Sequence, residues 1–495
     1  MRIPVIKDSS TPLYRQIQQF ITEQIECGAL VPGIRLPSNR ELAQSLGVSR
    51  IVVANAYAEL ESQGMVYGKR GSGTFIAPQY NALAAKRKDA ASATVDWPLW
   101  QQELLSHAWQ ASHQELDRLL GQAEQPGLIS FAERNKADPI WPIDGLRKAL
   151  LAALRQEPTV IGLGHQNLAG HYPLRETIAQ ILTTEGIPAH PDQVMINSGS
   201  QQALNLVSRV LLKAGDVVLV ESPTYNVAID LFRSMEVRLL GIPMDEQGMQ
   251  VDLIEPQLQA SKVKLIYTMP TFHNPTGVCL SGNRRRQLVA LAHRYNIPIL
   301  EDDYIGNMRY EGRAEPALKS LDPGGGVIYA GTFSKLLMPS LRIGFLVASG
   351  PIFSRVLACK YVSDLVTSDL LQHALREFIN VGRYHTHLHR VSQAYRQRRD
   401  TMINALHKYL PESRWVSPKG GGYVWLQLPD DLSSDKFFQF AVKEGVTFVP
   451  GSFFYPGQRT QSFLRLNFAI NEQNEIQEGI RRLSVAFHKF IANES

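Results

Sequence analysis

The sequence predicts an α/β protein built from more than one domain. From about residue 129 onward, apolar runs typical of strands alternate with amphipathic helical segments, which predicts a parallel sheet covered by helices. Beyond about residue 385, a long helix at residues 395–409 and strand-like runs near residues 423 and 463 predict a smaller α+β end domain. At 495 residues the chain exceeds one hydrophobic core, so we expect about two to four domains. The strand-like runs of the large domain begin at Val194, Val217, Leu265, Ile297 and Val327.

The composition is that of a globular protein with a large core, since 44% of the residues are hydrophobic and 20% are charged. A net charge of +5 is too small over this length to indicate a nucleic-acid partner by itself. Cys27, Cys279 and Cys359 lie far apart and show neither metal-ligand nor disulfide spacing, which favours the reducing cytoplasm. No apolar run of about 18 residues occurs, so we expect no membrane span.

The N-terminal segment is predicted to form three helices and a hairpin. Residues 11–30 carry apolar side chains at helical spacing. Ser38 and Glu41 form a capping box that opens a second helix. A tight turn at Gly47 leads to a third helix, and residues 65–77 then alternate as a β-hairpin with a basic, glycine-rich tip. A helix, a short turn and a second helix are the elements of a helix-turn-helix.

In a helix-turn-helix, the second helix enters the major groove of DNA through its N-terminal residues. Here those residues are Ser49, Arg50 and Ile51, while Arg40 starts the preceding helix, where it can reach a phosphate. The hairpin tip can lie along the minor groove or the backbone, and its residues are Lys69, Arg70 and Gly71. The spacing alone also allows an ordinary helical subdomain with surface arginines.

The composition changes at residue 79, after which small, polar and charged residues mix as they do in linkers. Trp97–Leu120 is more regular and predicts a helical part. We therefore expect residues 1–78 to form the DNA-binding domain, residues 79–126 a partly helical linker, and residues 127–495 the large domain with its smaller end domain.

Lys335 lies in the most informative stretch of the chain, Gly331-Thr-Phe-Ser-Lys-Leu-Leu-Met-Pro-Ser-Leu-Arg342. A lysine that follows small hydroxylated residues and precedes an arginine is what an enzyme dependent on pyridoxal 5′-phosphate (PLP) needs. Its amine can form a Schiff base with the cofactor's aldehyde. The hydroxyls and Arg342 can hold the phosphate.

Two further strand ends carry candidate residues. Asn274 can donate its amide to the cofactor's phenolic oxygen from the carboxyl edge of a sheet, although a plain Asn-Pro-Thr-Gly turn also explains it. An aspartate at the end of the strand that precedes Tyr304 can keep the pyridine nitrogen protonated. Tyr304 can bind the phenolic oxygen as well. Alternatively, Asp302 and Asp303 are capping or loop acids.

Three other candidates are weaker when each is taken alone. Gly199, Ser200 and Gln201 follow a strand and open a helix, where backbone amides bind phosphate, but ordinary strand–helix junctions look similar. Tyr225 can stack on the pyridine ring or belong to the core. Arg465 lies in an apolar strand and needs a partner, either a substrate carboxylate or a structural acid.

Several N-terminal segments resemble the winged helix of the GntR family over nearly all of residues 11–77. They are Thr11-Pro-Leu-Tyr-Arg-Gln-Ile, Pro32-Gly-Ile-Arg-Leu-Pro-Ser-Asn-Arg-Glu-Leu-Ala, Leu46-Gly-Val-Ser-Arg, Glu59-Leu-Glu-Ser-Gln-Gly and Gly71-Ser-Gly-Thr-Phe. The chain departs from the pattern at Ile51-Val52, where many relatives have a polar residue and Thr. Ile51 and Val52 carry no hydroxyl, so the hydroxyl contact with DNA that Thr can make is not expected here, and the base sequence that is read can differ.

The order of the later motifs resembles a fold-type I aminotransferase over roughly residues 129–490, and the combination with a GntR winged helix resembles the MocR subfamily of bacterial transcription regulators. The resemblance implies that PLP forms a Schiff base with Lys335 and that Asp302, rather than Asp303, pairs with its ring nitrogen. It implies that Arg465 binds an effector carboxylate. The other implied cofactor contacts are Asn274 and Tyr304 at the phenolic oxygen, Tyr225 at the ring face, and Gly199, Ser200, Gln201, Thr332 and Arg342 at the phosphate.

Two groups of histidines also stand out. His165 lies where aminotransferases carry a tyrosine that reaches the partner subunit's cofactor, so it can replace that contact. His385 and His389 share a helix face that can bind a metal, but a solvated face explains them better, and we predict no metal.

Two functions fit these observations. The first is a cytoplasmic, homodimeric transcription regulator that binds operator DNA and senses an amine, an amino acid or PLP itself through the aminotransferase-like domain. The second is a working aminotransferase that is tethered or autoregulated by its N-terminal module.

Overall fold

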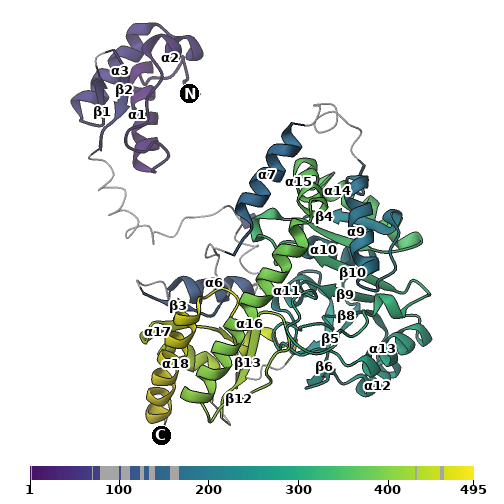
Figure 1. Ribbon diagram of the computed structural model, residues 1–495. Coiled ribbons are helices and arrows are strands. Elements are labelled where there is room, and N and C mark those ends of the chain that lie inside the picture. The colour runs from purple at the N-terminus through teal and green to yellow at the C-terminus, as the bar shows by residue number, and fades with distance from the viewer. Residues whose placement is uncertain are drawn as a thin grey trace. The chain divides into compact units, whose positions relative to one another are not determined.

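The computed structural model describes residues 1, 3–69, 71–78, 98, 100–101, 112–122, 127–132, 140–155, 167–429, 432–457 and 462–494. Arg70, His165 and half of the segment Trp97–Leu120 lie outside the described residues. The chain divides into two compact units, Met1–Ala108 and Trp109–Ser495, each of which is considered by itself (Figure 1).

The N-terminal unit has the predicted helix-turn-helix and hairpin. The predicted capping box is confirmed, because Ser38 Oγ accepts a hydrogen bond from the Glu41 backbone and the Glu41 carboxylate accepts one from the Ser38 backbone. Gly47, with φ 62°, ends this helix in the left-handed conformation that glycine tolerates. The elements are α1 (Leu13–Glu26), α2 (Asn39–Leu46), α3 (Arg50–Ser62), β1 (Val66–Lys69) and β2 (Gly73–Ile76).

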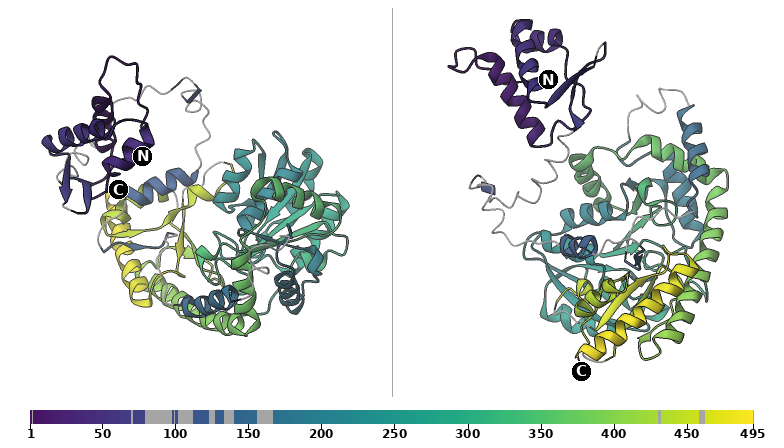
Figure 2. Two further views of the ribbon diagram at one scale, coloured as in Figure 1. Left: turned by 90° about the horizontal axis from the view of Figure 1, so that it is seen from above. Right: turned by 90° about the vertical axis from the view of Figure 1, so that its left-hand side faces the viewer.

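The second unit is built on an eight-stranded sheet with the order β4-β11-β10-β9-β8-β5-β6-β7. Its strands are β4 (Val194–Asn197), β5 (Val217–Ser222), β6 (Arg238–Asp245), β7 (Gly248–Met249), β8 (Val263–Thr268), β9 (Ile299–Asp303), β10 (Val327–Thr332) and β11 (Gly344–Val347). Alternate residues of β5 pack into different hydrophobic cores, Val218 and Val220 into one and Val217 and Leu219 into another. Helices therefore cover both faces of the sheet, as Figures 1 and 2 show.

The alternation of strands and helices predicted a parallel sheet, but the sheet is mixed. β11 runs antiparallel to both of its neighbours, β10 and β4. Only a turn and a short 3-10 segment, Pro339–Leu341, join β10 to β11. A parallel neighbour would need a longer crossover with a helix, so this short connection reverses the chain.

The second unit contains twelve α-helices among its described residues, which belong to the large-sheet domain or to the end domain. They are α6 (Ser112–Gln122), α7 (Ile143–Leu154), α9 (Tyr172–Thr184), α10 (Ser200–Leu211), α11 (Asn226–Ser234), α12 (Ile254–Ala260), α13 (Gly282–Arg294), α14 (Pro351–Asp364), α15 (Asp369–Asn380), α16 (Arg383–Tyr409), α17 (Ser434–Lys443) and α18 (Gln473–Glu494). None of the helices in the described part of the chain has the length and apolarity that a bilayer crossing requires.

The smaller α+β end domain has an antiparallel sheet with the order β12-β13-β16-β15. Its strands are β12 (Arg414–Trp415), β13 (Tyr423–Gln427), β15 (Val449–Pro450) and β16 (Phe463–Asn467), while β14 (Val446–Thr447) pairs with β3 (Ile129–Ser130). Ile476, Ile480 and Leu483 of α18 share a core with Leu464 and Leu466 of β16, so the C-terminal helix covers this sheet (Figure 2, right). The predicted helix at residues 395–409 begins earlier, at Arg383, directly after Gly382.

Candidate functional site

The candidate site lies at the carboxyl edge of the large sheet. In a parallel sheet this edge collects the loops that follow each strand, and open α/β proteins bind ligands there. A cavity of about 240 Å³ opens at this edge. Every residue predicted to contact the cofactor lines it: Gly199, Ser200, Gln201, Tyr225, Asn274, Asp302, Tyr304, Thr332, Lys335 and Arg342.

Lys335 enters the cavity from the turn after β10. Its neighbour Ser334 also lines the cavity, is 4% exposed, and has a hydroxyl that makes no hydrogen bond to any described residue. Thr332 is engaged differently, since its hydroxyl donates to the Ile343 carbonyl oxygen and accepts from the Ser334 backbone N–H. Ser334 therefore has a hydroxyl ready for an anion, whereas the family resemblance had implied Thr332 as the phosphate contact.

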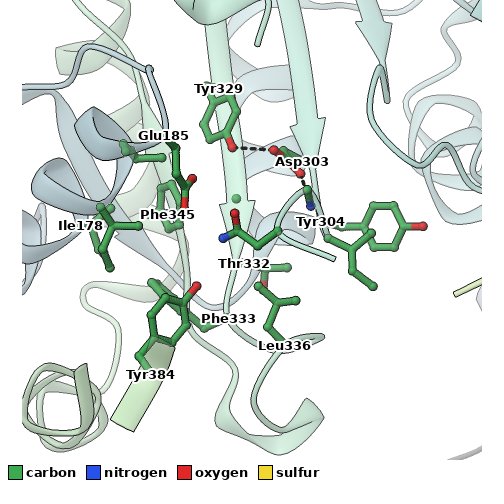
Figure 3. A pocket seen from close by; sticks show the side chains of 16 residues that line it. Ile178, Glu185, Asp303, Tyr304, Tyr329, Thr332, Phe333, Leu336, Phe345 and Tyr384 are labelled. Carbon is green, nitrogen blue, oxygen red and sulfur yellow. Dashed lines mark hydrogen bonds between the residues drawn. The ribbon is translucent and has the colours of Figure 1, made fainter. Parts of the chain in front are cut away.

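β9 sends its two terminal aspartates to opposite faces of the sheet, because successive side chains of a strand alternate. Asp302 lines the cavity, while Asp303 accepts a hydrogen bond from the Tyr329 hydroxyl at 2.7 Å and from the Gly306 backbone at 2.7 Å. Figure 3 shows Asp303 in this second, smaller pocket, with its bond to Tyr329. The register of β9 thus brings Asp302, and not Asp303, to the candidate site.

The carboxyl group of Asp302 is 2% exposed. Its Oδ2 accepts a hydrogen bond from the Tyr267 hydroxyl at 3.0 Å, whereas Oδ1 accepts none from any described residue. Burial raises the pKa of Asp302 to about 7, against the opposing effect of the Tyr267 hydrogen bond. A buried acceptor without a donor costs free energy, so a cationic or N–H partner inside the cavity would stabilise this oxygen.

An anion-binding corner is formed where β4 meets α10. Gly199 is the N-cap of α10, with φ 91°, so the helix presents its free backbone N–H groups and its positive dipole end. The Arg342 guanidinium lies beside it and donates to the Ser198 carbonyl oxygen at 3.0 Å. A methyl group on Gly199 would lie 3.0 Å from Arg342 Nη2, which explains why a glycine occupies this place.

Asn274 and Arg465 come together across the boundary between the large and the end domains. Arg465 Nη1 donates to Asn274 Oδ1 at 2.8 Å, and Asn274 lines the cavity. The Arg465 guanidinium also lies 4.4 Å from the ring centre of Tyr423 and 5.0 Å from that of Phe454. Arg465 is not among the lining residues, but its partners Asn274 and Tyr423 are, so it lies directly behind the wall.

Tyr304 points its hydroxyl at the backbone in this structure. The hydroxyl donates to the Phe272 carbonyl oxygen at 2.8 Å. A phenol carries one proton, so this group can donate to a cofactor oxygen only by turning away from that carbonyl. Sequence reasoning also missed three apolar or aromatic lining residues, Val227, Met269 and Tyr423. Tyr423 comes from the end domain, and no local pattern in the sequence signals its approach.

The α16 histidines differ from one another in burial. His385 and His389 are exposed. His387 between them is buried, and its Nε2 lies 2.9 Å from the Leu336 carbonyl oxygen. A carbonyl only accepts, so Nε2 carries the proton, and burial lowers the pKa of His387. His387 thus braces the turn that holds Lys335.

The residues present fit PLP. Asp302 Oδ1 suits a protonated pyridine nitrogen, the α10 N-terminus with Arg342 and Ser334 suits a phosphate, and Lys335 offers a primary amine to an aldehyde. The Asp302 oxygen and the Ser334 hydroxyl are both buried and have no partner among the described residues, so a bound cofactor would satisfy them.

The residues predicted to contact DNA lie at the start of α3, at the start of α2 and on the hairpin tip. Arg40, Arg50, Lys69 and Gly71 are exposed, and Gly71 has φ 77°. Ser49 is the N-cap of α3, and its hydroxyl accepts a hydrogen bond from the Val52 backbone at 3.4 Å. The N-terminus of α3 is therefore open to a partner and held in place by its cap.

Comparisons with known proteins agree with both parts of this description. Residues 146–483 match the family of class I and II aminotransferases, and residues 13–76 match the gntR family of bacterial regulatory proteins. The chain is 32% identical to the uncharacterized HTH-type transcriptional regulator YisV of Bacillus subtilis over 96% of each chain. It is 35% identical to aromatic-amino-acid aminotransferase 1 of Thermococcus litoralis, over 75% of this chain and 90% of that protein.

A solved structure is similar to the second unit. The crystal structure of Pyrococcus horikoshii kynurenine aminotransferase, in complex with PMP, matches 76% of this chain and 94% of its own, with a TM-score of 0.72 and 37% identity. The aminotransferase relatives cover only the C-terminal part, whereas the HTH-type regulators extend over the full length.

Proposed function

The chain belongs to the class I and II aminotransferase family and joins that domain to a GntR helix-turn-helix, as in the MocR transcription regulators, and from this premise we propose that an amine or amino acid controls its binding to operator DNA. It is a DNA-binding transcription regulator with a PLP-binding domain. The proposal adds the effector, a homodimeric state and a cytoplasmic location.

One observation carries the proposal: a single chain holds both a cavity suited to PLP and an exposed recognition-helix N-terminus. The cavity is lined by Lys335, Asp302 and Arg342, and Arg50 is exposed at the start of α3. A full-length relative that is 32% identical over 96% of both chains is named as a transcriptional regulator. An enzyme without a regulatory role would not need the N-terminal unit.

The residues of the cavity have separate tasks. PLP, when bound, supplies an aldehyde that reacts reversibly with primary amines. Lys335 Nζ would offer one such amine to the bound cofactor, and an effector would offer another. Asp302 holds a proton at the ring nitrogen, and the α10 N-terminus and Arg342 hold the phosphate. Arg465, whose planar guanidinium suits a carboxylate, grips the other end of an amino-acid effector.

Control of DNA binding requires that the effector bind more tightly to one arrangement of the two units than to another. A dimer presents two copies of α3, and helix-turn-helix dimers read two half-sites in successive major grooves. An effector bound at Lys335 and Arg465 would change the contacts between the large and the end domains, because Asn274 and Arg465 lie on opposite sides of that boundary.

A second function, transamination, is favoured by the same cavity. It offers a lysine, an aspartate and phosphate-binding residues, which are the groups that PLP chemistry needs, and an aminotransferase relative is 35% identical. Catalysis and sensing begin with the same exchange of amines at Lys335, so the cavity residues do not separate them.

The experiment that separates them measures DNA binding and turnover on one preparation. The full-length protein is first used to select its operator from random duplexes. Operator affinity is then determined with and without PLP and with a panel of amines and amino acids, and steady-state transamination is followed on the same compounds. We expect at least one compound to shift operator affinity. Robust multiple turnover with no such shift for any compound would establish the enzyme instead.

Two variants serve as matched controls for this experiment. Arg50→Ala should weaken operator binding and leave PLP binding unchanged, because Arg50 lies in the N-terminal unit. Arg465→Ala should remove the response to amino acids and leave effector-free operator binding unchanged. Loss of PLP from Arg50→Ala would contradict the division of roles between the two units.

A further inference from the structure

Ile51 is an exposed aliphatic side chain at the start of the recognition helix. It is the second residue of α3 and is 71% exposed, more than any other large apolar side chain of the described N-terminal unit. The buried residues of α3 lie on the other face of the helix; they are Val53, Ala56, Tyr57 and Leu60. A single exposed aliphatic residue is common on protein surfaces, so the position of Ile51 must distinguish it.

That position is the end of the helix that meets the bases. Ser49 caps α3 through its hydroxyl, Arg50 follows it, and both are exposed. In a helix-turn-helix, the side chains of this first turn contact base edges in the major groove. Ile51 is therefore held next to Arg50 by one capped turn, facing away from the core. A role for Ile51 in base contacts rests on the proposed function, in which this helix binds operator DNA.

The chemistry of the major groove restricts what an isoleucine can contact there. The base edges present hydrogen-bond donors and acceptors, and the apolar group among them is the C5-methyl of thymine. An isoleucine placed against a polar edge displaces water and returns no hydrogen bond, which is unfavourable. We propose that Ile51 is a specificity-determining residue that reads the methyl group of a thymine in each operator half-site.

A deoxyuridine scan tests this assignment, since uracil differs from thymine only in that methyl group. The operator selected by the full-length, PLP-loaded protein is resynthesised with each thymine replaced in turn by deoxyuridine. Affinity is measured at one fixed salt concentration. We expect one position per half-site at which the replacement weakens binding by about fourfold, the effect of one buried methyl group. In Ile51→Ala this sensitivity should disappear, and in Ile51→Val a reduced sensitivity should remain.

Val31 is the matched control for Ile51, since it is another exposed aliphatic residue of the N-terminal unit. Val31 is 49% exposed and lies two residues before Gly33, whose backbone N–H donates to the Ile76 carbonyl oxygen, and Val31→Ala should keep the wild-type scan. A scan without any sensitive thymine, or a sensitivity that persists in Ile51→Ala, would overturn the assignment while operator binding itself stands. Absence of sequence-specific binding in the wild type would instead refute the proposed function.

Discussion

At the scale of single residues, the alternation of side chains along β9 decides that Asp302 faces the candidate cavity. Asp302 and Asp303 are neighbours of the same type, yet one faces the candidate cavity and the other bonds Tyr329 in a separate pocket. Both carboxyl groups have a raised pKa because they are buried. Only Asp302 keeps an oxygen that accepts no hydrogen bond from the described residues, and this makes it the group that a bound cation would stabilise.

The pH dependence of the cofactor-free protein should reveal this carboxyl group. The pKa of Asp302 is raised to about 7, so folding favours its neutral form. Its contribution to stability is present below the unfolded pKa of about 4 and is lost as the pH rises through about 7. In Asp302→Asn the side chain is always neutral. Thermal unfolding of the cofactor-free proteins should therefore show the variant gaining about 1 kcal/mol or more over wild type between about pH 5 and pH 8.

Other buried carboxyl groups affect this comparison little. Glu301 also has a pKa raised to about 7 by burial, but it titrates in both proteins and cancels in the difference. The pKa of Glu221 is raised to about 7 mainly by burial, and the charge of Asp302 is its smallest cause, so its titration nearly cancels as well. A difference in unfolding temperature that stays constant with pH, or that shrinks as the pH rises, would contradict the assigned role of Asp302.

Lys335 is the residue whose loss should be seen directly by spectroscopy. In Lys335→Ala the covalent bond between the lysine and the cofactor's aldehyde carbon cannot form, so the visible absorbance of that bond should vanish. PLP should still be retained weakly, because the α10 N-terminus and Arg342 remain. The exposed Lys213 is a matched control, and Lys213→Ala should keep the absorbance. An unchanged spectrum for Lys335→Ala would place the cofactor lysine elsewhere.

At the scale of elements, the site is made by strand ends and by the helix that follows one of them. β4, β9 and β10 each deliver lining residues from the loop or turn at the carboxyl end. The junction of β4 with α10 needs a residue with positive φ and no side chain, because Gly199 has φ 91° and a side chain there would meet Arg342. The same junction supplies the helix dipole that favours a phosphate.

Gly199→Ala tests this junction. The added methyl group would lie 3.0 Å from Arg342 Nη2 and would occupy a backbone conformation that alanine disfavours. We expect PLP affinity, measured by fluorescence titration, to fall by about tenfold, the loss of about one charge-assisted hydrogen bond. Gly215 has φ 82°, but a methyl group added there would meet no atom within 4 Å, so Gly215→Ala carries similar strain without the clash. Equal losses in both variants would point to backbone strain rather than to the phosphate corner.

At the scale of the whole molecule, two units with separate cores carry the two roles. The core of the N-terminal unit is formed by residues between Ile3 and Ile76, and none of them belongs to a core of the second unit. Separate cores imply separate unfolding transitions. The consequence for function is that a ligand of one unit stabilises that unit first.

Calorimetry should therefore resolve which transition responds to PLP. At about 100 times its Kd, PLP should stabilise the second unit by about 2.7 kcal/mol and leave the transition of the N-terminal unit in place. Leu42 is fully buried in the N-terminal core, and Leu42→Ala should lower only the PLP-insensitive transition, by about 2–5 kcal/mol. Leu406→Ala, in the core of the second unit, should lower the other transition. A single transition that moves with both substitutions would show that the units unfold together.

Much of the architecture could be predicted from local patterns. The capping box at Ser38 and Glu41 was visible because it acts within one helical turn. The alternation of strands and helices was visible for the same reason, since an apolar strand and an amphipathic helix are each recognised from a few neighbouring residues. The reversal of β11 could not be predicted, because it depends on how a short connection returns the chain to the sheet.

The sequence by itself determined the chemistry available to this protein: a lysine after hydroxyls, an arginine beyond it, and a capped helix with arginine and isoleucine at its start. The family resemblance already favoured Asp302 over Asp303, but only the tertiary structure decided that Ser334 rather than Thr332 has a hydroxyl to spare, and that Arg465 bonds Asn274. The physical reason is the distance along the chain over which each kind of interaction acts. Capping and amphipathic patterns act over a few residues, whereas strand register and the packing of the end domain join groups that are distant along the chain.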